Sequence, residues 1–397
     1  MLVGLAAGVA TLLLRPRSGL IEPAAVQKTG YFSAREIERA EEFRGPQRTI
    51  SLVALAVSGG TLALIALRPS RRMRRALERA GARPIAGGAA VGAGLSLVLA
   101  LASLPLDAVA HKRAYDVGLS TQEWLPWLGD VGKSSAIATL FAAGLSAGAV
   151  SVSRAAPRRW WAPAAVGVTA VSAAFVFLSP LVLEPVFNKF TPLPEGPLRA
   201  DVLRLAERSG VDVGEVFRMD ASRRGTAVNA YIGGLGATKR VVLYDNLVDG
   251  FPDAEVRSVI AHELAHQRYS DLPKGLLWLA IVTLPATLLA QRLTERLAPG
   301  TVGSPAMLPA LALSVTLISL AVGSAGNVLS RQVEARADAF ALELTRDPSA
   351  FIALERRLAT RNISDPDPPA LMHALFGTHP TTLERIGYGV SWQRREG

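Results

Sequence analysis

The stretch from residue 160 to residue 183 reads WWAPAAVGVTAVSAAFVFLSPLVL, 24 residues in a row without a charged side chain. A helix that crosses a membrane needs about 20 apolar residues, so this stretch is long enough to span one. Five further uncharged runs are of comparable length: residues 50–67, 84–106, 134–153, 275–291 and 297–330. The last run can include a turn near residues 299–305, which leaves 306–328 as the span itself.

Residues 1–14 form a shorter apolar run, which we interpret as a seventh span that begins at or near the membrane face. No basic residue precedes it and no small-x-small cleavage site follows it, which argues against a signal peptide. The predicted fold class is therefore a mainly α membrane protein with about seven transmembrane helices.

The composition of the 397-residue chain suits helices packed in lipid. Half of the residues are hydrophobic, 19% are charged, and the mean hydropathy is +0.28. The absence of cysteine excludes a disulfide scaffold, a thiol nucleophile and a cysteine-ligated metal. The net charge of +10 comes from basic residues that lie between the apolar runs. Because this placement is typical of membrane flanks, we predict membrane lipids and no nucleic acid as partners.

Two polar stretches interrupt the apolar runs and divide the chain into four parts. We predict a membrane region at 1–187, a catalytic segment at 188–274, two further spans within 275–330 and a second catalytic segment at 331–397. Because two spans separate the polar stretches, both emerge on one side of the membrane and can build one small α+β domain at its face. Residues 34–44 are predicted to form a solvated helix on that side.

The arginines give one indication of orientation. Residues 68–83 carry seven arginines on the side opposite the polar domain. By the positive-inside rule, this distribution places the polar domain outside the cytoplasm. Residues 15–48 carry seven lysines and arginines on the side of the polar domain, and this count favours the opposite orientation.

Residues 258–267 read SVIAHELAHQ and contain the pattern His-Glu-x-x-His. A spacing of four residues places His262 and His266 on one helix face, where both imidazoles can reach one zinc ion. Glu263 lies beside them and can take a proton from the attacking water. Pro252 and Asp253 indicate where the helix begins. The alternative is an ordinary helix in which two histidines only pack.

A catalytic zinc ion needs a third protein ligand and an open fourth position. In the segment RQVEARADAFA at 331–341, Glu334 and Asp338 are four residues apart and share a helix face. We predict Glu334 as the third ligand of one zinc ion per chain, and Asp338 as a carboxylate that orients a ligand imidazole. An amphipathic helix with two exposed acids is the alternative.

The residues before the His-Glu-x-x-His helix have the pattern of a β-hairpin. AVNAYI at 227–232 and RVVLY at 240–244 flank a glycine-rich turn, GGLG, at 233–236. An edge strand here can hold an extended substrate by backbone hydrogen bonds. A strand that only packs is the alternative.

Three further histidines lie outside the motif. His379 lies with Arg385 in the segment GTHPTTLERI at 377–386, and either side chain can donate to an oxyanion at the zinc ion. His379 can alternatively cap the helix that follows. We predict that His111 is a surface residue in the short loop after the third span and that His373 is structural.

Together these residues resemble the membrane zinc endopeptidases of the Ste24 type, the CAAX prenyl protease 1 family, which groups with the HtpX-like proteases among the M48 peptidases. The similarity rests on four blocks: NAY at 229–231 with KRVVLYD at 239–245, AHELAH at 261–266, EARAD at 334–338, and THP at 378–380 with Arg385. A further segment at 115–122 extends the resemblance into the N-terminal half, so that it covers nearly the whole chain.

The resemblance implies a ligand set and a set of roles. Zinc would be held by His262, His266 and Glu334, with Glu263 as general base and acid. The 227–232 strand would align the substrate, while Asn229 and His379 would bind substrate or stabilise the tetrahedral intermediate. The helices would enclose a large water-containing chamber with the active site at one end.

The resemblance also implies peptide or protein substrates, including lipidated or membrane-associated ones, and CAAX-box protein processing. It places the catalytic side in the cytosol, which conflicts with the arginine count. The Ala/Arg/Gly-rich composition is typical of a bacterial protein, here one of the cell membrane, so that a prenylated substrate need not be its own.

Three other functions make different demands on the sequence. An HtpX-like quality-control protease for membrane proteins needs fewer spans than seven. An intramembrane site-2-type protease carries its motif inside an apolar span, whereas charged residues such as Asp253 and Arg268 flank the motif here. A non-catalytic membrane protein with a structural metal, such as a transporter or receptor, would have ionisable residues within its spans, and these runs have none.

Overall fold

The computed structural model of the protein describes residues 2–233 and 239–396. Within these residues, six helices are long and apolar enough to cross a membrane. They are α3 (Ala34–Leu67), α5 (Pro84–Asp116), α6 (Trp124–Ala155), α7 (Trp161–Leu178) with its continuation through a π-turn (Ser179–Leu183) and α8 (Glu184–Phe187), α12 (Asp271–Leu297) and α13 (Leu308–Thr345). The prediction of a mainly helical membrane protein is confirmed.

The predicted first span forms α1 (Leu2–Leu14), a helix of 13 residues. Its length of about 20 Å is less than the roughly 30 Å of a hydrocarbon core. The helix packs along α12 and α13, where Ala7 and Ala10 share an apolar cluster with Trp278 and Leu329. Trp278 Nε1 also donates to Thr11 Oγ1 at 3.0 Å. A seventh crossing therefore stays a prediction.

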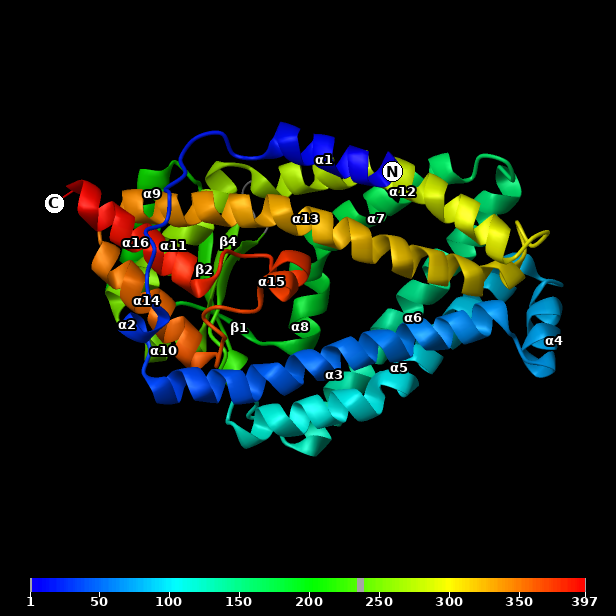
Figure 1. Ribbon diagram of the computed structural model, residues 1–397, viewed down its shortest axis with the longest axis horizontal. Helices are drawn as coiled ribbons and strands as arrows, with labels where there is room; N and C mark the ends of the chain where they lie inside the picture. Colours follow the sequence, from blue (N-terminus) through cyan, green and yellow to red (C-terminus); the bar gives the residue numbers. More distant parts are fainter. Residues whose placement is uncertain (1, 234–238, 397) are drawn as a thin grey trace.

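The long helices run lengthwise through the molecule and join two different ends (Figure 1). The small sheet and the helices around it lie at the end near the C-terminus, and α4 (Arg71–Ala80), which carries much of the arginine cluster, lies at the other end. Between the ends, α5 and α6 pack closely because Gly92 has no side chain. A Cβ atom at Gly92 would come within 2.5 Å of the Ala142 carbonyl oxygen.

The small domain is built on a four-stranded sheet in the order β1-β2-β4-β3. Its strands are β1 (Phe190–Pro192), β2 (Glu215–Met219), β3 (Ala230–Gly233) and β4 (Arg240–Tyr244). Strands β2 and β4 are parallel, a pairing that was not predicted, and β3 runs antiparallel to β4 along the edge. The predicted turn at 233–236 lies outside the described residues from 234 onward.

The remaining elements are helices and short turns. They are α2 (Lys28–Tyr31), α9 (Pro197–Ser209), α10 (Asp245–Gly250), α11 (Asp253–Arg268), α14 (Pro348–Arg361), α15 (Ala370–Phe376), α16 (Thr382–Glu396) and the 3₁₀ turns Ala221–Arg223 and Pro305–Met307. The core of the small domain forms around α11, where Val256, Ile260, Ala261 and Leu264 are fully buried.

Two predicted segments are parts of longer helices. Residues 34–44 continue without a break into the span of α3, and the Ser33 side chain caps its first turn with Glu36 as the partner of the capping box. The helix that carries Glu334 is likewise the end of α13, the last long helix. The polar end of α13 is thus held rigidly by its apolar part.

The prediction for His111 was wrong. This residue belongs to α5 rather than to a loop, because the helix continues ten residues beyond the uncharged run. Its side chain is buried, stacked on Trp127 at 4.7 Å between ring centroids and edge-on to Trp124 at 5.0 Å. Aromatic side chains at the start of the next helix cover it, and the sequence pattern of α5 alone does not reveal that contact.

Candidate metal centre

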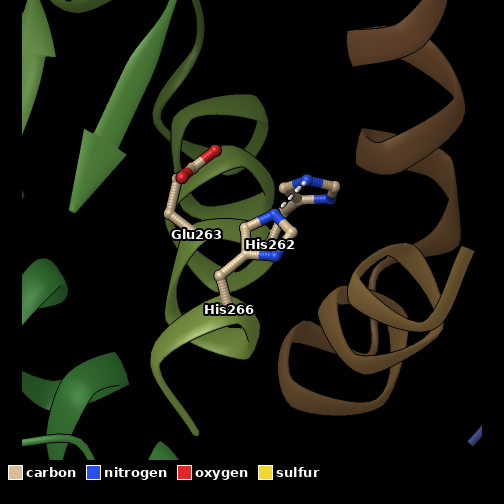
Figure 2. Close-up of side chains that lie close together, drawn as sticks. All are labelled: His262, Glu263 and His266. Atoms are coloured by element: carbon tan, nitrogen blue, oxygen red, sulfur yellow. Dashed lines mark hydrogen bonds between the residues drawn. The ribbon is translucent and has the colours of Figure 1, made fainter. Parts of the chain in front are cut away.

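Helix α11 brings the two histidines of the motif together (Figure 2). The helix begins after Pro252, with Asp253 and Glu255 in its first turn, where acidic side chains favour the helix dipole. His262 Nε2 and His266 Nε2 are 3.3 Å apart. One ligand atom each of His262, Glu263 and His266 lie within 4.8 Å of one another.

Glu334 of α13 lies next to both histidines. Its Oε2 lies 3.1 Å from His262 Nε2, and its Oε1 lies 3.7 Å from His266 Nε2. Zinc–ligand bonds of about 2.0–2.1 Å in tetrahedral geometry put ligand atoms about 3.3–3.4 Å apart. The distances scatter around that value and involve both oxygens of Glu334, so this carboxylate lies where a third zinc ligand would be expected.

The charges around His262 also favour a cation. Burial by itself lowers the pKa of His262, but the carboxylates of Asp338 and Glu334 outweigh burial and raise the pKa well above its ordinary value. In the absence of a metal, the imidazole therefore tends to hold a second proton. A divalent cation bound there would balance the negative charge of the same two carboxylates in place of that proton.

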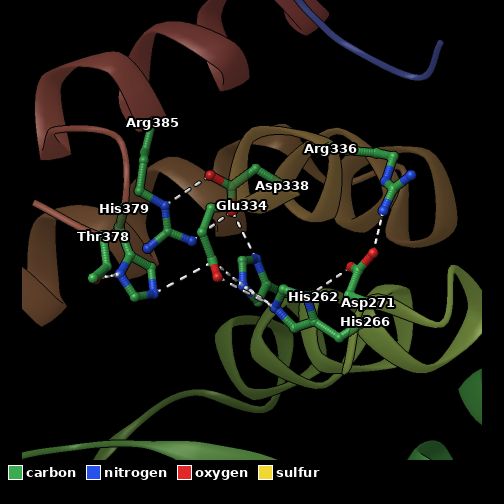
Figure 3. Close-up of polar contacts among 9 residues, drawn as sticks. All are labelled: His262, His266, Asp271, Glu334, Arg336, Asp338, Thr378, His379 and Arg385. Atoms are coloured by element: carbon green, nitrogen blue, oxygen red, sulfur yellow. Dashed lines mark hydrogen bonds and ion pairs between the residues drawn. The ribbon is translucent and has the colours of Figure 1, made fainter. Parts of the chain in front are cut away.

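Asp338 holds the first imidazole in place (Figure 3). Asp338 Oδ1 lies 2.8 Å from His262 Nδ1, and because a carboxylate only accepts, we assign the donated proton to Nδ1. That tautomer leaves the Nε2 lone pair for a metal. Arg385 fixes Asp338 in turn through Nε at 2.8 Å and Nη2 at 2.5 Å.

The direct oxyanion role considered for Arg385 does not agree with these contacts. Its Nε and Nη2 bond to Asp338, and its Nη1 bonds to Glu355 Oε2 at 2.9 Å. The guanidinium is thus enclosed between two buried carboxylates, and it supports His262 through Asp338.

Asp271 contacts the second motif histidine, His266, and the sequence pattern did not predict this contact. Its Oδ2 lies 3.1 Å from His266 Nδ1, and its other oxygen pairs with Arg336 of α13 (Figure 3). Each motif histidine therefore has a carboxylate on Nδ1 and an arginine behind that carboxylate. Asp271 belongs to the first turn of the next helix, so only the bend between α11 and α12 brings it back to the motif.

We expect Asp271→Asn to weaken zinc binding by about 10–100-fold, because the imidazole loses the charged acceptor that fixes its orientation and raises its basicity. Chelator competition on the purified protein measures the change. Asp253→Asn at the exposed start of α11 is the matched control, with unchanged affinity expected. Equal affinities for wild type and Asp271→Asn would show that the contact does not support the metal.

Glu263 lies beside the two histidines, on the side nearer the sheet (Figure 2). Burial raises the pKa of its carboxyl, although the neighbouring histidines oppose the change. A carboxyl group with a raised pKa is better suited to accept and return a proton near neutral pH.

His379 lies at the open side of the centre. Its Nε2 is 3.3 Å from Glu334 Oε2, its Nδ1 is 2.8 Å from Thr378 Oγ1, and 56% of its side chain is exposed. The helix-cap alternative is wrong, because Thr381 and Glu384 form the reciprocal capping bonds at the start of α16. His373 contacts the same segment, since its Nε2 lies 2.8 Å from the His379 carbonyl oxygen.

Asn229 is exposed and directly precedes β3, and its carbonyl accepts from the Tyr244 N–H at 3.2 Å. Within the described residues, no hydrogen bond or ion pair joins Asn229 to the histidines. Its predicted role in binding substrate stays a prediction.

Glu355 is a second residue that the sequence did not indicate. It lies on α14 with 3% exposure, and its Oε1 has no hydrogen-bond partner within the described residues. Burial raises the pKa of Glu355 to about 7; Arg385 opposes the change, and Asp338 adds to it. The folded protein therefore favours the protonated form up to near-neutral pH.

We expect the wild type to lose stability relative to Glu355→Gln as the pH rises from about 4.5 to about 7, by up to about 3 kcal/mol. Below this window Glu355 is protonated in both the folded and the unfolded chain, and within it only the unfolded chain releases the proton freely. Thermal unfolding midpoints of both proteins at pH 5 and pH 8 measure the difference. A difference that does not change with pH would contradict a raised pKa.

Comparison with known families agrees with this geometry. Residues 192–388 match the model of peptidase family M48, and residues 25–189 match the model described as CAAX prenyl protease N-terminal, five membrane helices. The Bacillus subtilis metalloprotease YhfN is 30% identical over 301 residues, which cover 74% of this chain and 70% of YhfN. This chain belongs to peptidase family M48.

Two further similarities are to proteins of the CAAX prenyl protease type. A CAAX prenyl protease 1 homolog from Oryza sativa is 33% identical over 226 residues, or 55% of this chain and 52% of the rice protein. This M48 chain thus spans about half the length of its plant relative. The crystal structure of S. mikatae Ste24p matches the fold with a TM-score of 0.78 at 21% identity, covering 98% of this chain and 95% of that one.

These findings identify the protein as a multi-pass membrane metalloprotease of the Ste24 type within M48. M48 peptidases are zinc metalloproteases, and His262, Glu263 and His266 are the candidate metal-binding group here. The sequence-based resemblance is confirmed.

Proposed function

We propose that this M48 protease is a zinc-dependent endopeptidase that binds one zinc ion through His262, His266 and Glu334 and cleaves extended peptide segments of membrane-associated proteins. The observation that carries the proposal is the position of the Glu334 carboxylate of α13 beside both histidines of α11. Its Oε2 lies 3.1 Å from His262 Nε2 and its Oε1 lies 3.7 Å from His266 Nε2, and the two Nε2 atoms are 3.3 Å apart. The match to Ste24p over 98% of the chain supports the Ste24 type over an HtpX-like quality-control protease.

The chain's own residues have separate roles in this reaction. When bound, a zinc ion supplies the Lewis acid that polarises the scissile carbonyl and makes water easier to ionise. Glu263 accepts the proton of the attacking water and returns it to the leaving amine. Asp338 and Asp271 keep the two imidazoles oriented, and His379 lies where it can donate to the developing oxyanion.

The edge strand β3 supports an extended substrate conformation. The Asn229 carbonyl faces β4, and because backbone groups alternate along a strand, Ala230 and Ile232 face the open edge. Gln267 of α11 already donates to the Ile232 carbonyl at 3.2 Å. The Ala230 N–H and carbonyl and the Ile232 N–H are then the groups that a substrate strand would pair with, and because Ala230 is only 2% exposed, this pairing requires the edge to open further.

We expect N-methylation of the substrate backbone to reduce cleavage at alternate positions only. A methyl group on the amide that pairs with the Ala230 carbonyl should lower kcat/KM about tenfold or more, because it removes one hydrogen bond and places bulk at the edge. Methylation of the residue before or after should change it little. A series of singly methylated quenched peptides, assayed with the zinc-loaded protein, measures this pattern.

A prenylated and an unprenylated version of one peptide form a separate arm of this experiment. Faster cleavage of the prenylated peptide supports the substrate class named for the rice relative. Equal cleavage supports a peptide protease that does not require the lipid. A methylation profile without alternation would contradict strand pairing on β3 in either case.

A further inference from the structure

A cavity of about 430 Å³ lies between α3 and the segment around α15, apart from the metal ligands. Arg44, Gln47 and Arg48 line one part of it, and Leu52, Leu55 and Phe376 line another. Its volume is within the range of small-molecule sites, and its lining combines an apolar wall with a few polar groups. None of these six residues has a part in the reaction described above.

The two parts of the lining differ in depth along α3. Arg44, Gln47 and Arg48 precede the uncharged run that begins at residue 50, whereas Leu52 and Leu55 belong to it. From residue 44 to residue 55 the helix rises about 16 Å. If α3 crosses the membrane through this run, the basic part lies at the level of the lipid headgroups and the apolar part lies deeper.

The arginines are held in place and still have N–H groups to offer. Arg44 donates from Nε to the Ile363 carbonyl at 2.7 Å and from Nη2 to the Asn362 carbonyl at 2.5 Å. Arg48 pairs through Nη2 with Asp365. These bonds leave Nη1 of each guanidinium, and two arginines against one aspartate leave the cavity positively charged.

Gln47 contributes its side chain to the wall between the two parts. Its Nε2 donates to the Ala110 carbonyl at 3.4 Å, and its Oε1 is buried, so this oxygen does not face the cavity. The charged groups of the lining are therefore the two guanidinium groups. A ligand that suits the cavity carries an anionic group and an apolar chain.

We propose that this cavity binds one anionic phospholipid, such as phosphatidylglycerol. The phosphate lies at Arg44 and Arg48, and an acyl chain lies along Leu52, Leu55 and Phe376. Charge complementarity and the depth of the apolar part favour a membrane lipid over a peptide. The inference is independent of the proposed proteolysis.

The lipid would also support the segment that carries His379. Asn327 of α13 donates to the Leu375 carbonyl at 2.8 Å, and Arg331 donates to the Gly377 carbonyl at 2.7 Å, so α15 is tied to α13 on one side. The lipid fills the side towards α3. We therefore expect bound phosphatidylglycerol to raise the midpoint of thermal unfolding as well as to bind.

Native mass spectrometry and thermal unfolding of the delipidated full chain in detergent test this proposal. We expect phosphatidylglycerol to saturate at one tightly bound molecule per chain, about tenfold or more tighter than phosphatidylcholine with the same acyl chains. Glycerol 3-phosphate, which has no acyl chain, should not compete at equal concentration.

Two variants test the charged part and the apolar part of the cavity separately. Arg48→Gln should weaken phosphatidylglycerol binding about tenfold, and Leu55→Trp should weaken it by filling the apolar part while the arginine contacts remain. Because Arg48→Gln also breaks the Asp365 pair, Leu55→Trp keeps the test valid if that variant folds poorly. Arg35→Gln at the exposed start of α3 and Arg74→Gln in the arginine-rich α4 are matched controls, with unchanged binding expected.

Equal binding of phosphatidylcholine and phosphatidylglycerol would overturn the proposal. So would loss of binding in Arg74→Gln with retention in Leu55→Trp, because the lipid would then belong to the α4 arginines. Glu263→Gln should bind the lipid as the wild type does. A failure of peptide cleavage therefore leaves the lipid result unaffected, and the two inferences fail separately.

Discussion

Glu263→Gln is expected to bind zinc like the wild type and to lose about 10²–10⁴-fold in turnover, the range usual for a general acid–base group. The amide has nearly the same shape as the carboxyl but cannot accept the proton of the attacking water. The ligand atoms of His262, His266 and Glu334 are left unchanged. Metal content by elemental analysis, together with cleavage of a quenched extended peptide, measures both properties on one preparation.

The control for this variant is a second glutamate of α11. Glu255 near the start of the helix is buried and pairs with Arg357 at 2.8 Å, so Glu255→Gln tests the loss of a buried charge away from the metal. We expect it to affect stability more than turnover. Cleavage by Glu263→Gln within a few-fold of the wild-type rate would rule out Glu263 as the general base.

Glu334→Gln is expected to lose most of its zinc together with its activity. The variant replaces a charged ligand by a neutral amide in the three-ligand set, so the loss of affinity should exceed the roughly 10–100-fold effect of removing a supporting carboxylate. Chelator competition gives the affinity, and addition of excess zinc tests whether cleavage returns. Partial return at high zinc would show that the loss arises from metal binding.

Glu343→Gln is the matched control for Glu334→Gln, since Glu343 is exposed on the same helix. We expect it to bind zinc and cleave peptide as the wild type does. Retention of one zinc ion per chain at unchanged affinity in Glu334→Gln would contradict its place as third ligand. Glu263, which has a ligand atom within 4.8 Å of ligand atoms of both imidazoles, would then be the next candidate for third ligand.

The fold class and the centre of the site follow from local sequence patterns. Uncharged runs of membrane-spanning length predict the long helices because a lipid environment tolerates few other arrangements. The spacing of His262 and His266 predicts their convergence because four residues make about one helical turn. Glu334 and Asp338 could be predicted for the same reason, once a partner for the histidines was sought.

The continuity of α3 and α13 was harder to predict. Both helices combine an apolar run with a charged stretch, and each was predicted as a span next to a separate helix. In both helices the composition changes from apolar to charged, but the helical hydrogen bonding continues through the change, so composition alone does not show that the helix is unbroken. The prediction for His111 failed for a related reason, since α5 continues past the end of its uncharged run.

The sequence by itself therefore determined that this protein is a helical membrane protein with a two-histidine, two-carboxylate metal motif. Both features can be read from neighbouring residues, the spans from the length of uncharged runs and the motif from a spacing of four residues. Tertiary contacts alone brought Asp271 back to His266, placed Glu355 against Arg385 and paired β2 with β4 in parallel. These contacts join elements that turns and packing bring together, and no local spacing encodes them.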